Sequence, residues 1–109
     1  MRSMETEGRL AVAVEYIPIC RSIKITLDSG YEHLAMVDCL QMQIWDGEQI
    51  KSLPKPTDDQ LANVKIWGGG GSILFPSIDQ LFDVDKITCG IFGDRNWMQR
   101  LSEKIAIAA

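Results

Sequence analysis

The chain has 109 residues, of which 46% are hydrophobic and 24% are charged, and its 15 acidic and 11 basic side chains give a formal net charge of -4. This length suits one domain with one hydrophobic core, and the composition excludes a disordered protein. The acidic balance gives no attraction to phosphate backbones, so we expect no direct nucleic-acid binding.

The sequence carries no segment typical of secretion or of a membrane span. No window approaches about 18 consecutive apolar residues, and the polar residues 1–8 are predicted to be a frayed tail rather than a signal peptide. Three cysteines, Cys20, Cys39 and Cys89, are odd in number and form no Cys-x-x-Cys pair. We therefore expect reduced, buried cysteines in a cytoplasmic protein that does not bind membranes.

The first third of the domain is rich in strand-forming residues. Residues 9–17 predict a strand that Pro18 ends, because proline lacks a backbone donor. In residues 20–27, apolar Ile23, Ile25 and Leu27 alternate with polar residues, as in a half-buried strand. The turn residues Asp28-Ser29-Gly30 then predict a hairpin.

Residues 31–45 fit two interpretations. As a strand, Tyr31, His33, Ala35 and Val37 share one face; as a helix, Leu34, Val37 and Ile44 recur at helical spacing. We favour a strand to about Leu34 or Val37, followed by irregular or helical chain over residues 38–45. Asp46-Gly47 then predicts a turn.

The second half predicts short elements separated by proline and glycine. Pro54 and Pro56 stiffen an extended segment, and Thr57 with Gln60 predicts a capping box on a short helix. Residues 64–67 and 72–75 read as strands joined through Gly68–Gly71 in a hairpin with unusual φ values, and Pro76 ends the second strand.

Two helices are predicted near the C-terminus. A short one around residues 83–89 is stopped by Gly90, and Asp94 caps a final helix over Arg95–Ile107, in which Trp97, Leu101 and Ile105 recur every four residues. We expect one α+β domain over residues 9–109, built from antiparallel β-hairpins with short helices and a C-terminal helix packed on the sheet.

Candidate chemistry is sparse. Successive glycine amides can cradle an anion, which makes Gly69, Gly70, Gly71 and Ser72 the candidate ligand-binding residues, although no phosphate-loop pattern follows them and a structural hairpin is favoured. His33 is the only histidine, so it can form no histidine cluster around a metal. We predict no catalytic residues, no metal site and no cofactor.

Aromatic residues offer the other candidate site. Trp45, Trp67 and Trp97 are expected mainly in the core, with an oligomer interface as the alternative. The apolar residues Trp97, Leu101 and Ile105 of the final helix are the candidate interface, and we expect a homo-oligomer, a dimer or higher.

A set of motifs runs through the middle of the chain: Leu53-Pro54, Pro56–Asn63, Ile66–Pro76 and Ile78-Asp79, with Val84 beyond. Together they resemble the bacterial domain-of-unknown-function family 2442, over roughly Val14 to Gly93. Phe75 stands where the family commonly has Trp, and Gln80-Leu81-Phe82 replaces an acidic run. The chain therefore resembles a divergent member, with its C-terminal helix outside the pattern.

The resemblance implies a small α+β domain without an assigned activity, in a family often encoded beside small toxin-like proteins. Because no catalytic set is evident, the favoured interpretation is a non-enzymatic protein–protein interaction module, antitoxin-like or accessory to a small partner protein. The alternative is a small-molecule or anion-binding domain that uses the Gly68–Gly71 hairpin.

Overall fold

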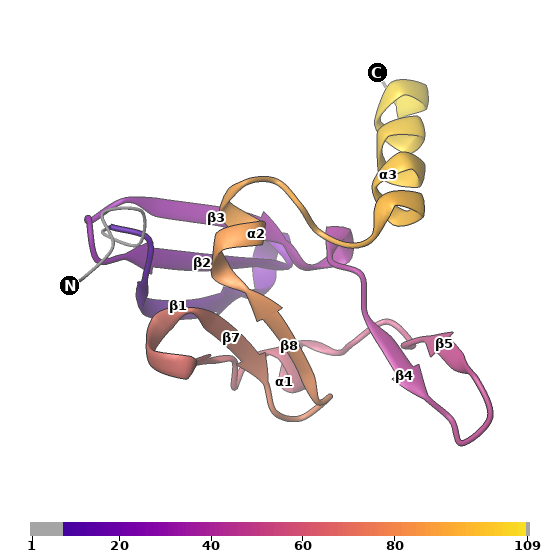
Figure 1. Cartoon of the computed structure of the whole chain (residues 1–109), viewed down its shortest axis with the longest axis horizontal. Helices are drawn as coiled ribbons and strands as arrows, with labels where there is room; N and C mark the ends of the chain where they lie inside the picture. Colours follow the sequence, from indigo (N-terminus) through magenta and orange to yellow (C-terminus); the bar gives the residue numbers. More distant parts are fainter. Residues whose placement is uncertain (1–7, 109) are drawn as a thin grey trace.

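The computed structural model describes residues 8–108, with side chains up to Lys104. The predicted tail therefore lies outside the described residues, apart from Gly8. Within this range the chain forms two three-stranded antiparallel sheets, a separate two-stranded hairpin and three α-helices (Figure 1). The predicted α+β class with antiparallel hairpins is confirmed.

The N-terminal sheet has the order β1-β2-β3. It consists of β1 (Ala11–Ile17), β2 (Ser22–Leu27) and β3 (Glu32–Met36). A β-bulge between Ala11 and Ala13 leaves Val12 exposed. The strand interpretation of residues 31–37 is confirmed, because residues 32–36 pair with β2 across the Asp28-Ser29-Gly30 turn.

A second hairpin, called the arm below, consists of β4 (Gln43–Trp45) and β5 (Ile50–Ser52) and projects from the body (Figure 1). The expectation of irregular or helical chain over residues 38–45 is wrong for this strand; the preceding 3-10 helix η3 (Val37–Cys39) and the irregular residues 40–42 fit it. Asp46 explains the difference. Its carboxylate accepts the amides of Glu48 and Gln49 at 2.9 and 2.8 Å, which closes a tight turn between the two strands.

The C-terminal sheet has the order β6-β7-β8. It consists of β6 (Lys65–Trp67), β7 (Ser72–Phe75) and β8 (Gln80–Asp83). The predicted glycine hairpin is confirmed, since η4 (Gly68–Gly70) joins β6 to β7 with positive φ at all three glycines. No sequence pattern predicts β8, which pairs with β7 after a turn at residues 76–79 in which Asp79 has a φ of 52°.

The helices begin at the predicted caps. Helix α1 (Asp58–Leu61) has both capping-box bonds between Thr57 and Gln60, and α2 (Val84–Thr88) follows β8 directly. In α3 (Arg95–Ala108), the Trp97 amide donates to the Asp94 carboxylate at 2.8 Å. The first turn of α3 contacts the body, and the rest of the helix extends away from both sheets (Figure 1).

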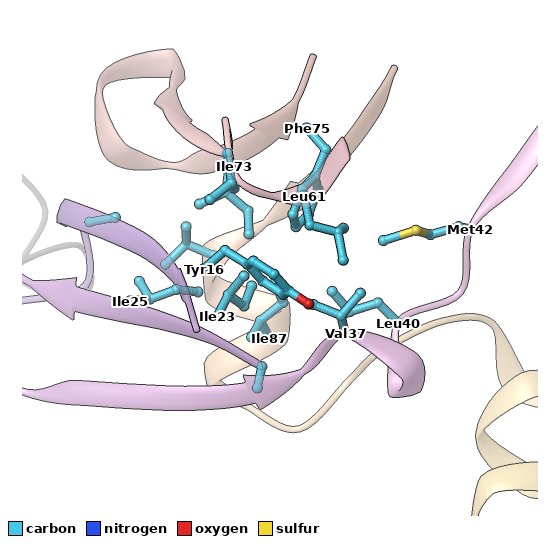
Figure 2. Packing of buried hydrophobic residues seen from close by; sticks show 14 of the residues in the cluster. Tyr16, Ile23, Ile25, Val37, Leu40, Met42, Leu61, Ile73, Phe75 and Ile87 are labelled. Atoms are coloured by element: carbon cyan, nitrogen blue, oxygen red, sulfur yellow. The ribbon is translucent and has the colours of Figure 1, made fainter. Parts of the chain in front are cut away.

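The two larger sheets share one hydrophobic core. Its most deeply buried side chains come from both sheets, from η3, and from helices α1 and α2 (Figure 2): Ile23, Ile25, Val37, Leu61, Ile73, Phe75 and Val84. Phe82 meets Phe75 edge-on with ring centroids 6.0 Å apart. The arm and most of α3 lie outside this core, and the apolar arm residues Ile44, Trp45 and Ile50 are exposed.

Candidate functional site

A polar clamp joins the N-terminal sheet to helix α1. The Tyr16 hydroxyl donates to the Asp58 carboxylate at 2.6 Å, and the Arg21 guanidinium lies 3.7 Å from the same carboxylate oxygen. Arg21 also donates to both oxygens of Asp38, at 2.9 Å from Nη2 and 3.2 Å from Nε. Lys55 approaches Asp38 to 3.9 Å. These five residues form one connected network.

Three members of the clamp have shifted pKa values. Burial first, and then the hydrogen bond to Asp58, raise the pKa of Tyr16 to about 12. The bidentate bond from Arg21 lowers the pKa of Asp38, and the same bond raises the pKa of Arg21. Each of these three shifts moves the pKa away from neutral pH, whereas general acid–base catalysis works best with a pKa near the operating pH. The clamp therefore connects the N-terminal sheet to helix α1.

The arm exposes large apolar side chains. Trp45 and Ile50 stand opposite each other in the register of the two strands, and they are 63% and 62% exposed. Ile44, on the other face, is also exposed, and its cross-strand partner Lys51 places its amine 2.8 Å from Asp46. A two-stranded hairpin is marginally stable without further packing. The arm is thus a small hairpin with exposed apolar side chains on both faces.

The arm is attached to the body through a side-chain amide. Gln80, at the start of β8, donates to the Gln43 carbonyl at 2.9 Å and accepts the Gln43 amide at 3.3 Å. This pair of bonds imitates one step of strand pairing between β8 and β4. Gln80 therefore fixes the position of the arm relative to the C-terminal sheet.

A hollow of about 200 Å³ lies at the base of the arm. Buried Val37, Leu40, Met42 and Pro56 line it together with Leu53, and Trp97 of α3 forms one wall. Its polar lining residues are Asp38, Ser52 and Lys55. The Trp97 indole is held in place because its Nε1 donates to the Cys39 carbonyl at 2.7 Å. The hollow is mainly apolar and has the size of one large side chain.

Of the predicted interface residues in α3, the structure describes two side chains. Trp97 and Leu101 are half-buried, whereas the side chain of Ile105 lies outside the described residues. Gln41 and Asp94 secure the start of the helix through two hydrogen bonds, at 3.1 and 2.9 Å. The first turn of α3 is thus part of the body.

The three tryptophans differ from the expectation that they lie mainly in the core. Trp45 in the arm and Trp67 in β6 are exposed, and only Trp97 is half-buried. On the outer face of the C-terminal sheet, Trp67 lies near the Lys65 ammonium, which is 5.5 Å from its ring centroid, and Leu81 is exposed as well. Sequence patterns missed these positions because a short alternating strand does not reveal which face is covered.

The glycine hairpin packs against the N-terminal sheet. Gly70 is buried, and a Cβ at this position would lie 2.6 Å from the Ala11 carbonyl oxygen. The Gly71 amide donates a hydrogen bond to the Gly68 carbonyl, and the Gly71 carbonyl accepts one from the Val84 amide. Among the predicted ligand-binding residues only Gly69 is exposed; Gly71 and Ser72 are half-buried. The glycines thus permit close packing of η4 on β1.

The remaining candidate groups lie apart from these features. His33 is half-buried in β3, where its ring stacks at a tilt on Tyr31 with centroids 5.0 Å apart. The expectation of buried cysteines is wrong for Cys20, which ends the 3-10 helix η2 (Pro18–Cys20), and for Cys89, which follows α2; both are exposed, and Cys39 is half-buried. Within the described side chains, no group of three or more His, Cys, Asp or Glu residues could hold a metal ion.

A solved structure shares this fold. It is the crystal structure of a protein of unknown function from Rhodospirillum rubrum ATCC 11170, with a TM-score of 0.65 and 24% sequence identity, over 82% of this chain and 95% of that chain. At this identity the similarity concerns the fold alone. No family model matches the chain, and no curated protein matches it. In residues 8–108, no helix is both long and apolar enough to cross a membrane.

Proposed function

We propose that this chain is a non-enzymatic protein–protein interaction module, antitoxin-like or accessory to a small partner protein, which also self-associates. The observation that carries the proposal is the arm, where Trp45 and Ile50 face each other across the two strands and both remain exposed. Tryptophan is enriched at interface centres, and exposed apolar patches mark interaction sites.

The state of the polar groups supports the non-enzymatic part of this proposal. Tyr16 and Arg21 engage the carboxylates of Asp58 and Asp38, and His33 stacks on Tyr31. These polar groups stabilise the fold through contacts within the chain. The exposed apolar side chains of the arm, by contrast, have no such structural role. The resemblance to family 2442 supports the antitoxin-like part and remains a prediction.

The experiment is co-expression of the chain with the products of its neighbouring genes, followed by purification through a tag on this chain. We expect a neighbouring small protein to co-purify in a stoichiometric complex, and Trp45→Ala to weaken that complex or the self-association. Recovery of the wild-type chain alone, under conditions that preserve other weak complexes, would contradict the partner hypothesis. The mass of the purified chain in solution tests self-association separately.

A further inference from the structure

We propose that the arm of one copy docks on the base of the arm of a second copy, so that Trp45 of each fills the hollow beside Trp97 of the other. This inference rests on the proposed function, because it specifies how the chain self-associates. The dimer is reciprocal and has two equal contacts. In each contact, Trp45 of one copy is the anchor and the other copy provides the hollow.

The arrangement of anchor and hollow favours a second copy as the occupant. Trp45 lies near the tip of the arm, and Ser52, which shares its face of the hairpin, lines the hollow at the base. The strands between tip and base are three residues long and span about 10 Å. A two-fold axis through the middle of the arm therefore brings each tip over the other base, which is the self-complementary geometry of a closed dimer.

The charges of the arm also favour this antiparallel arrangement. The tip carries Asp46, Glu48 and Lys51; Lys51 pairs with Asp46, and Glu48 has no ion pair within the described side chains. The base carries Lys55, whose side chain is 70% exposed and whose nearest carboxylate, Asp38, is already held by Arg21. In the antiparallel arrangement, the negatively charged tip of one arm faces Lys55 at the base of the other, which is attractive. Two arms side by side in parallel would instead place like charges together.

The chemistry of the hollow matches the anchor. Its buried lining is apolar, and the fixed Trp97 indole offers an aromatic wall for a second indole. Arg100 lies 5.9 Å from the Trp97 ring and adds a positive group to the same region. Aromatic, methionine and arginine residues are the types enriched at interface cores, and Met42, Trp97 and Arg100 supply all three.

The test measures the mass and the dissociation constant of the full chain by analytical ultracentrifugation over a concentration series. We expect a dimer that Trp45→Ala weakens at least tenfold, because each dimer loses two anchors. Trp67→Ala is the matched control: it removes another exposed tryptophan, which lies in the C-terminal sheet, and leaves the dimer unchanged. Circular dichroism verifies that both variants retain the fold.

A charge-reversal experiment tests the reciprocal pairing. Glu48→Lys alone places lysine against Lys55, and Lys55→Glu alone places glutamate against Glu48, so each variant dimerises more weakly than the wild type. Mixed together, the two variants form a heterodimer in which both contacts join opposite charges. We expect the mixture to recover affinity over either variant alone, by several-fold at low salt.

Three outcomes would overturn the inference. A monomeric wild type, a dimer that Trp67→Ala rather than Trp45→Ala disrupts, or a charge-reversed mixture no tighter than its components would each contradict the reciprocal contact. If the chain is monomeric and Trp45→Ala instead abolishes binding of a co-expressed neighbour, the arm binds that protein; the inference and the proposed self-association then fail, while the proposed binding of a small partner protein stands.

Discussion

The Tyr16 hydroxyl and the Asp58 carboxylate are joined by a 2.6 Å hydrogen bond although 42 residues separate them in sequence. Tyr16 lies in β1, and Asp58 is the first residue of α1. The bond therefore fastens the N-terminal sheet to the segment that leads from the arm into the C-terminal sheet.

Replacement of Tyr16 by phenylalanine removes this bond and keeps the ring in the core. We expect the free energy of unfolding to fall by about 1 kcal/mol, the net contribution of a typical hydrogen bond, because the Asp58 side chain is largely exposed. Urea denaturation measures the loss. Tyr31→Phe is the control, because Tyr31 is exposed, and an equal loss in both variants would contradict a specific role for Tyr16.

The same contact predicts a dependence of stability on alkaline pH. Burial, followed by the Asp58 bond, raises the pKa of Tyr16 from its ordinary value of 10.0 to about 12. Because the folded state binds this proton more tightly, the stabilisation is complete below pH 10 and is lost as the pH rises from 10 to 12. In Tyr31→Phe, Tyr16 is the single tyrosine, and its absorbance at alkaline pH reports its ionisation directly. Ionisation near pH 10 in the folded protein would contradict the prediction.

Replacement of Asp94 tests how α3 begins. The carboxylate accepts the Trp97 amide at 2.8 Å and the Gln41 side-chain amide at 3.1 Å. Asp94→Ala should reduce helicity and change the Trp97 environment, whereas Asp94→Asn retains a capping oxygen and should change both less. The hydrogen bond from the Trp97 backbone amide lowers the pKa of Asp94. The stabilisation that the Asp94 carboxylate gives to the folded state is therefore present at neutral pH and is lost in acid, below the ordinary pKa of 3.8. Circular dichroism and tryptophan fluorescence follow both variants, and equal effects would contradict the cap.

Two alanine substitutions separate backbone conformation from packing in the glycine hairpin. Gly69 and Gly70 both have positive φ, 68° and 103°, but only at Gly70 does a Cβ meet the backbone of β1. We expect Gly69→Ala to lower the free energy of unfolding by about 1 kcal/mol and Gly70→Ala by more than about 2 kcal/mol. Thermal and urea denaturation compare the two. A smaller loss at Gly70 would mean that η4 does not pack on β1.

Replacement of Gln80 by alanine should free the arm without unfolding the body. The variant removes both hydrogen bonds to the Gln43 backbone. We expect faster amide hydrogen exchange in residues 43–52 and unchanged exchange in β2, because the arm has little other packing. Mass spectrometry of peptic fragments measures both segments. Equal acceleration in both would show that Gln80 stabilises the whole fold rather than the arm.

Local sequence patterns predicted much of the secondary structure. The alternation in residues 22–27, the Thr57–Gln60 capping box, the Asp94 cap and the positive φ values of the glycine run all follow from short-range chemistry. By contrast, the pattern over residues 38–45 predicts irregular or helical chain where β4 forms, and no pattern predicts β8. Each strand has only three or four residues, and its identity depends on a partner strand and a turn rather than on periodicity.

The candidate site depended far more on tertiary structure. The sequence by itself determined an acidic α+β chain with one histidine, a glycine hairpin and an amphipathic C-terminal helix. Only the tertiary structure decided that Gly70 packs on β1, that Trp45 lies outside the core while Trp97 borders a hollow, and that Tyr16 reaches Asp58. The physical reason is that composition and periodicity report which residues can be buried, whereas exposure depends on which distant segment covers each face.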